Sequence, residues 1–352
     1  MKKSLFTLSA IALATSTASA YTLVDNKETG TKLDFSGSAR IVWLSTANKT
    51  DNLNGTVTKK HINYAVKNNG SRFGFQLKQD IAEGFYGLGR VEWRFRKTSS
   101  SQHDFGNVYT HQLYAGIGHK QYGELVHGNM TVITDGVKQT DLGNTLSLSD
   151  GLLVSSARKV TQYTHKGIEG LTAGVYYGDK SKRNMNGLDL KDRRKDVWGV
   201  GAIYNEKLDD LQSVKLGAGF TRERLESSKS QAYALGIAYT FDKTTVGIDL
   251  ERKKTDYNNT ASKKTQNEVR TVLSQQLTDV WRAYGMYAYK TSKEATKVKK
   301  HQYMIGTEYT FVPKYLKGFV EWQTSYANSY TNGAKTKKTR DNVTAIGLRA
   351  YW

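Results

Sequence analysis

The sequence predicts an all-β protein, a transmembrane antiparallel up-and-down β-barrel of about 16 strands. Apolar and polar residues alternate with a period of two in segments along the whole chain. Short and long polar connections alternate between these segments, as in a barrel with short turns at one end and long loops at the other. The 352 residues include one Pro, which suits a large hydrogen-bonded sheet because Pro removes a ladder donor.

The first 20 residues are typical of a cleaved secretory signal peptide. Lys2 and Lys3 precede an apolar run at 5–13, and the run is followed by an Ala-Ser-Ala cleavage site at 18–20. The apolar run is too short to cross a bilayer as a helix. We therefore expect residues 1–20 to be removed and residues 21–352 to form one barrel domain.

The stretch from Phe85 to Arg96 carries the clearest strand pattern. Its odd positions are apolar or Gly, and its even positions end in charged residues: Arg90, Glu92, Arg94 and Arg96. Successive strand side chains point to opposite faces. The charged face needs water, because burying unpaired charges in an apolar medium is costly. We expect this strand to face an aqueous lumen on one side and lipid on the other.

Six further segments show the same alternation: 33–43, 72–80, 233–241, 246–251, 303–311 and 346–352. Long polar connections are expected at 47–69, 98–108, 131–157, 180–195, 225–229, 252–264, 293–300 and 331–341. Aromatic residues concentrate near strand ends, for example Trp43, Trp93 and Trp352, as in the interfacial belts of membrane proteins. The alternative is a soluble β-sandwich, whose two inner faces would pack together.

The formal net charge is +20, or +18 without Lys2 and Lys3. Most of the surplus lies in four connections: 180–195, 252–264, 290–300 and 331–341. These segments could be solvated loop tips, or a positive surface that attracts anions or contacts anionic lipid headgroups. The chain has no nucleic-acid-binding motif, so we expect no nucleic acid partner.

The connection at 131–157 differs from the others because it is long, nearly uncharged and rich in aliphatic residues. Long loops without their own elements are usually functional. We expect it to fold inward and pack on the barrel wall, although it could simply cover the rim. Its acids Asp135, Asp141 and Asp150 would then face inward basic residues of the early strands: Arg40, Arg72, Lys78, Arg90 and Arg94. Opposed rows of charge set ion preference, and the excess of Arg favours anions.

Several motifs resemble the general-diffusion porins of Gram-negative outer membranes, most of all those of the Pasteurellaceae. They are Asn69-Gly70-Ser71-Arg72-Phe73-Gly74-Phe75, the strand from Glu83 to Phe95, Tyr114-Ala115-Gly116, Gly167-Ile168-Glu169-Gly170-Leu171 and the ending from Gly347 to Trp352. The resemblance implies a trimer of sixteen-stranded barrels. It also implies a third extracellular loop folded into each pore, opposite an arginine cluster.

Carried onto this chain, the resemblance places Arg40 and Arg72 at basic wall positions and Arg158 near a further one. His111 occupies a position where many relatives have Arg. The chain lacks the Pro-Glu-Phe-Gly-Gly element at the loop tip, so Asp135 and Asp141 are the acids we place at the constriction. Trp352 stands where the family usually ends in Phe.

The resemblance further implies an outer-membrane porin for passive diffusion of small hydrophilic solutes and ions. We expect outer-membrane lipid and lipopolysaccharide as surroundings, a homotrimer, and no cofactor or metal. None of the seven His belongs to a catalytic signature, so we expect no enzyme. Two alternatives remain: a substrate-selective channel, and a surface barrel whose basic loops mediate adhesion.

Overall fold

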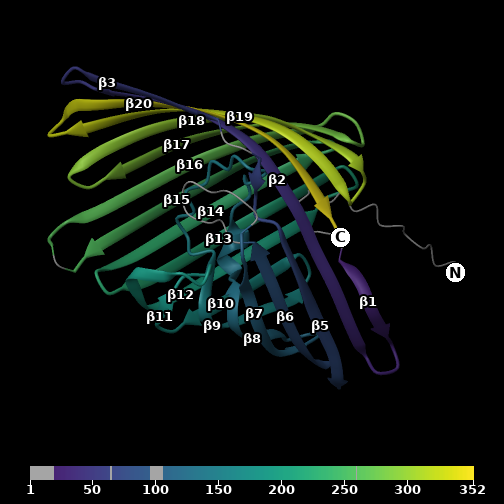
Figure 1. Ribbon diagram of the computed structural model, residues 1–352. Helices are drawn as coiled ribbons and strands as arrows, with labels where there is room; N and C mark the ends of the chain where they lie inside the picture. Colours follow the sequence, from purple (N-terminus) through teal and green to yellow (C-terminus); the bar gives the residue numbers. More distant parts are fainter. Residues whose placement is uncertain (1–19, 64–65, 96–105, 259) are drawn as a thin grey trace.

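The computed structural model describes residues 20–63, 66–95, 106–258 and 260–352. These residues form one closed, antiparallel β-barrel in which each long strand pairs with its neighbours in sequence (Figure 1). Within the described part of the chain, no helix is long and apolar enough to cross a membrane. Residues 1–19 of the signal peptide expected at 1–20 lie outside the described residues, and so does most of the connection expected at 98–108.

Sixteen long strands build the wall: β2 (Thr31–Asn52), β5 (Arg72–Ala82), β6 (Phe85–Phe95), β7 (Val108–His119), β8 (Gly123–Thr131), β9 (Ser156–Ile168), β10 (Leu171–Gly178), β12 (Asp189–Lys207), β13 (Gln212–Leu225), β14 (Ser228–Phe241), β15 (Thr244–Tyr257), β16 (Lys263–Gln276), β17 (Trp281–Lys293), β18 (Thr296–Val312), β19 (Leu316–Thr331) and β20 (Ala334–Tyr351). The remaining elements are short: β1 (Tyr21–Asn26), β3 (Thr56–Asn63), β4 (Lys67–Asn68), β11 (Ser181–Arg183) and the 3-10 turn η1 (Ile133–Val137).

The barrel closes between β2 and β20, whose register runs from the Ser38–Tyr351 pair to the Asn52–Lys337 pair. The other edge of β2 pairs with β3, β4 and β5 in turn. At the seam the amide of Gly37 donates to the carbonyl of Trp352 at 2.8 Å. The Trp352 indole lies within 2.4 Å of where a Cβ at position 37 would stand, so any larger residue there would require the ring to move.

Side chains of the wall strands alternate between a lipid-facing outer surface and the inner surface, as the sequence predicts. On β14 the outer face carries Tyr233, Leu235 and Ile237, all exposed. On β15 the inner positions Asp249 and Glu251 are buried against the loop that fills the barrel. Polar residues therefore line the interior, while the exposed apolar side chains face outward.

Several segments expected to be polar loops are strands instead. β2 continues to Asn52 and returns as β3, and β20 already begins at Ala334. Connection 252–264 likewise belongs largely to β15 and β16, and 293–300 to β17 and β18. Ladder hydrogen bonds join backbone groups and need no apolar side chain, so these hairpins keep pairing beyond the apolar band. The loss of alternation marks the end of the lipid-facing zone and not the end of the strand.

Candidate pore constriction

Residues 132–155, between β8 and β9, fold into the barrel and pack on its inner wall. η1 places Val137, which is fully buried, against Leu153, Ala232 and Ala234. Further along, Leu146 and Leu148 join a second buried cluster with residues of β2 and β16–β20. The aliphatic residues that made this segment unusual are therefore its contacts with the wall, and the expectation of an inward-folded loop is confirmed.

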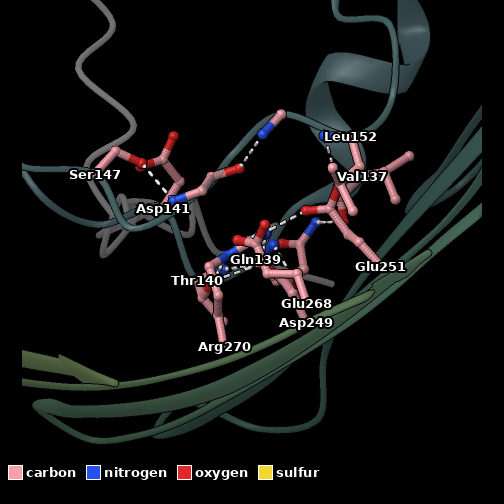
Figure 2. A network of polar contacts seen from close by, with 12 residues as sticks. Val137, Gln139, Thr140, Asp141, Ser147, Leu152, Asp249, Glu251, Glu268 and Arg270 are labelled. Atoms are coloured by element: carbon pink, nitrogen blue, oxygen red, sulfur yellow. Dashed lines mark hydrogen bonds and ion pairs between the residues drawn. The ribbon is translucent and has the colours of Figure 1, made fainter. Parts of the chain in front are cut away.

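Polar contacts with β15 and β16 fix the middle of the loop (Figure 2). Asp249 accepts hydrogen bonds from the backbone amides of Gln139 at 2.8 Å and Thr140 at 3.0 Å. The Thr140 hydroxyl donates to the same carboxylate at 2.5 Å. Arg270, which has no exposed surface, pairs with Asp249 at 2.9 Å and donates to Thr140 at 3.1 Å. The loop is thus bound to two charged wall residues, to Asp249 through its backbone amides and to Arg270 through the Thr140 hydroxyl.

The same arginine connects a wider ionic network. Its guanidinium contacts Glu251 at 2.6 Å and also Glu268. Glu251 accepts from the amide of Leu152 at 3.2 Å, and Glu268 accepts from the amide of Asp150 at 3.2 Å. Each buried carboxylate therefore has both a cation and a loop amide as partners, which compensates for its lost hydration.

A second anchor lies on β19, at Glu321. This residue is fully buried, and its carboxylate accepts from the amides of Asn144, of Thr145 at 2.9 Å and of Leu146 at 2.7 Å. The Tyr284 hydroxyl donates to it at 2.7 Å. Hydrogen bonds to an ionised acceptor are among the strong ones in proteins. Three successive amides on one carboxylate hold the loop backbone in a fixed turn.

These anchor residues are not among those predicted for the constriction. A signal was nevertheless present, because Asp249, Glu251 and Glu268 interrupt strands whose other face is apolar. Such acids point toward the lumen and need partners there. What could not be foreseen is that their partners are backbone amides of a segment 99 to 118 residues away in the chain.

Opposite the loop, the early strands bring basic residues together on the inner wall. Arg72 of β5 lies directly across from Arg94 of β6, and Arg40 of β2 lies across from Arg349 of β20. Arg72 is within electrostatic reach of Arg94, Arg40 and Arg349. The structure thus adds Arg349 to the predicted set, from a strand at the other end of the chain.

Glu92 organises the β6 part of this cluster. Only 4% of its surface is exposed, and its carboxylate contacts Arg94 at 2.6 Å and Arg90 at 3.2 Å. Gln112 of β7 donates to it at 3.1 Å. His111 is buried beside the same cluster and interacts with Arg94 and Glu92. Lys78 lies elsewhere, with its ammonium 3.8 Å from the Tyr86 ring centre.

Two loop acids face the open part of the lumen. Asp135 and Asp141 are both exposed, and the Ser147 hydroxyl donates to Asp141 at 2.9 Å (Figure 2). The surrounding protein restricts hydration and raises the pKa of Asp135 above its ordinary value; Lys138 opposes this rise, Asp141 adds to it and Arg94 opposes it. Arg94 of the wall is therefore close enough to act electrostatically on Asp135.

Two other predicted residues do not join this group. Asp150 pairs with Lys290 of the wall at 2.5 Å, so it belongs to the ionic network of the loop anchor. Arg158 lies at the start of β9, where its guanidinium donates to the Asn184 carbonyl at 3.4 Å. It helps to line a basic pocket with residues of 180–195. The candidate constriction therefore consists of Arg40, Arg72, Arg90, Arg94 and Arg349 on the wall and Asp135 and Asp141 on the loop.

The described residues contain no group of three or more His, Cys, Asp or Glu that could hold a metal ion. The fold and the lumen together define the class of protein. It is a membrane-spanning barrel with a water-accessible passage that an internal loop narrows.

Comparison with known proteins gives the family. Residues 7–333 match the family model of the Gram-negative porins, so the chain belongs to that family. The major outer membrane protein of Pasteurella multocida strain Pm70 is 27% identical over 378 aligned residues, covering 100% of both chains. The protein is therefore a passive diffusion channel of the outer membrane.

Solved structures share the fold. OmpT of Vibrio cholerae, folded in vitro, has a TM-score of 0.68 at 16% identity and covers 95% of this chain and 100% of its own. An anion-selective porin from Comamonas acidovorans has a TM-score of 0.65 at 15% identity, covering 92% of this chain and 100% of its own.

Proposed function

We propose that this channel is a general-diffusion pore with a preference for small anions. The observation that carries the proposal is the unequal charge of the constriction. The wall contributes Arg40, Arg72, Arg90, Arg94 and Arg349, of which Glu92 compensates only part. The loop contributes Asp135 and Asp141 beside Lys138. A passage with more fixed cations than anions concentrates anions and repels cations.

The two rows of charge also act on neutral solutes. Arg94 of the wall acts electrostatically on Asp135 of the loop, and fixed charges of opposite sign on wall and loop produce a field across the passage. A small polar solute can orient its dipole in that field, whereas an apolar solute gains nothing from it and must still displace ordered water. This favours small hydrophilic solutes without requiring a dedicated binding site.

Ion preference can be measured in planar lipid bilayers under a KCl gradient. The reversal potential of the wild-type protein should be shifted from zero toward the equilibrium potential of chloride. Arg72→Ala should shift the reversal potential toward the equilibrium potential of potassium. Asp141→Ala should shift it further toward that of chloride. Lys243→Gln, in the exposed turn between β14 and β15, is the control and should leave it unchanged. A clear cation preference of the wild type would overturn the proposal.

We further propose a homotrimer that associates through strands near the two ends of the chain. An outward-facing apolar groove of about 620 Å³ lies there, over β2 and β17–β20. It is lined by residues such as Ile41, Trp43 and Ile346. OmpT of Vibrio cholerae has been solved in a trimer form. Chemical crosslinking of protein folded in detergent should give a three-subunit species, and Trp43→Lys should weaken it.

Two alternatives give different outcomes in the same experiments. A substrate-selective channel would show saturable block of single-channel current by its solute. A barrel that serves as an adhesin would lose cell attachment, but not conductance, when 180–195 is shortened. Membership of the porin family favours a channel over an enzyme.

A further inference from the structure

The wall of the barrel is low at β8, β9 and β10. β8 and β10 contain 9 and 8 residues, whereas β12 contains 19 and β20 contains 18. The ladder between β8 and β9 ends at the Thr131–Ser156 pair, because the chain leaves the wall there to form the internal loop. Since the strands share the short turns at the opposite end, the rim at the end with the long connections is lower here.

A hairpin follows β10 and extends from this low part of the rim. It consists of β11, the turn 184–188 and the first residues of β12, and we call it the mouth hairpin (Figure 1). The ladder pairs Ser181–Arg194 and Arg183–Asp189 join its two arms. The turn is thus the outermost part of a short two-stranded extension of the wall.

The turn of the mouth hairpin has a defined conformation. The Asn184 side chain accepts from the amides of Asn186 at 2.9 Å and Leu188 at 3.1 Å. The amide of Gly187, whose φ is 75°, donates to the Asn184 carbonyl at 3.0 Å. Asn side chains stabilise turns in this way, and glycine adopts a positive φ without strain. The tip therefore projects from the rim as a fixed unit.

The base of the mouth hairpin is attached to the start of β9. The guanidinium of Arg194, which is 7% exposed, donates to the Asp179 carbonyl at 2.8 Å and also to the Arg158 carbonyl. The Arg158 guanidinium in turn donates to the Asn184 carbonyl at 3.4 Å. These hydrogen bonds hold the hairpin against the end of β9.

The tip of the mouth hairpin reaches the lumen side of β7. The hydroxyl of Tyr109 donates to the Asn186 side chain at 2.9 Å. β8 and β9 lie between β7 and β10 in the wall, so the hairpin spans the ends of two strands. Tyr109 is paired with Arg94 in the β6–β7 ladder, and its ring lies 6.1 Å from that of the buried His111. Because paired residues share a face of the sheet, the tip lies beside the arginine cluster.

The tip carries bulk but no charge. Residues 184–188 read Asn-Met-Asn-Gly-Leu, without an ionisable side chain. The charges at its base, on Arg183 and Asp189, pair with each other at 3.3 Å. A neutral obstacle at the mouth of an aqueous passage has little effect on small ions, but it reduces the cross-section that a large solute needs.

We propose that the mouth hairpin is a second size-selecting element of the pore, in series with the internal loop. With its tip bound to Tyr109, it narrows the entrance to the arginine cluster, so that bulky hydrophilic solutes such as oligosaccharides are excluded while small ions and monosaccharides enter. Tyr109 and Asn186 determine this specificity, because their hydrogen bond holds the tip on the lumen side. The inference rests on the diffusion pore proposed above and concerns its size limit, which is independent of its ion preference.

Polymer exclusion in planar bilayers can test the proposal. Neutral polyethylene glycols of increasing size are added on the side that the long connections face, and a polymer that enters the pore lowers the single-channel current. Asn186→Ala and Tyr109→Phe remove the hydrogen bond without changing charge. A single neutral hydrogen bond shifts an equilibrium about 2- to 10-fold, so the polymer at the size limit of the wild type should enter more often by this factor. Replacement of 184–188 by Asn-Gly, which forms a two-residue turn, should admit that polymer freely.

The matched control is Asn54→Ala, in an exposed Asn-Gly turn at the tip of the β2–β3 hairpin. It should keep the polymer limit of the wild type. Reversal potentials under a KCl gradient should stay unchanged in all these variants, which separates this test from that of ion preference. An unchanged polymer limit in both point variants would overturn the role of the hydrogen bond. An unchanged limit in the Asn-Gly replacement as well, or an equal change in Asn54→Ala, would overturn the proposal altogether; a lower midpoint of urea unfolding with that unchanged limit would mean that the hairpin only completes the wall.

Discussion

Arg72 and Arg94 stand directly opposite each other across β5 and β6, and the carboxylate of Glu92 contacts Arg94 at 2.6 Å. Two arginines facing one another on the inner wall would be unfavourable in an apolar medium. They are tolerated because the lumen is wet and because a nearly buried glutamate lies beside them. Glu92 thus sets how much positive charge the passage presents.

Glu92→Gln should increase the anion preference of the channel. Glutamine has nearly the same shape as glutamate and can still accept the hydrogen bond from Gln112. The substitution nevertheless removes the negative charge shared by Arg90 and Arg94. The variant should still fold, and its reversal potential under a KCl gradient should move further toward the equilibrium potential of chloride. Asp242→Asn, in the exposed turn after β14, should have no effect. An unchanged potential in Glu92→Gln would show that this carboxylate does not influence the passage.

The ion preference should depend on pH through Asp135. Its pKa is raised, so on acidification it takes up a proton at a higher pH than an ordinary aspartate, whose pKa is about 3.9. Protonation removes a negative charge from the lumen, so anion preference should rise as the pH falls through this raised pKa. In Asp135→Asn the preference should already be high at neutral pH, and this step should disappear. Identical pH profiles of variant and wild type in bilayer recordings would contradict the assignment.

Arg270→Met should detach the loop from β15 and β16. The substitution leaves Asp249, Glu251 and Glu268 without their shared cation, and breaking a buried ionic network of this kind costs about 3–5 kcal/mol. We expect a lower midpoint of urea unfolding and a noisier single-channel current. Arg252→Met, next to Glu251 but on the outer face, is the control and should retain the wild-type midpoint.

Leu148→Ala tests the apolar contact of the loop separately from its charges. Leu148 is fully buried among residues of the wall, including Met304 and Phe319. Truncation of a buried leucine to alanine costs about 2–5 kcal/mol. Both the unfolding midpoint and the stability of the open current should fall. Leu53→Ala, at an exposed leucine, should change neither; equal effects of the two variants would mean that the loop does not depend on this packing.

The wall could be predicted in considerable detail, because strand alternation is a local property. The apolar face of 85–95 and its charged partner face lie where the pattern indicated, with Arg90, Arg94 and Glu92 inside the barrel. The same pattern underestimated the length of the strands at the end of the barrel that carries the long connections. Polar hairpins such as β2–β3 and β19–β20 pair through their backbones, which side-chain hydrophobicity does not report.

The constriction could be predicted only in part. Aliphatic residues in 131–157 indicated an inward loop, and alternation indicated Arg40, Arg72 and Arg94 on the facing wall. Arg349 was missed because only the closure of β20 on β2 brings it beside Arg40. Arg158, placed near a basic wall position by resemblance, lies at the start of the wall strand β9, where its guanidinium donates to the Asn184 carbonyl.

The sequence by itself determined a strand-built wall with one wet face and one apolar face, because each strand carries that information in neighbouring residues. Only the tertiary structure decided which distant charges meet. Asp249 accepts from the backbone amide of Thr140 and Arg270 donates to its hydroxyl, because barrel closure sets the distances between residues far apart in the chain. Contacts of this kind depend on register and curvature, which no local pattern of side chains encodes.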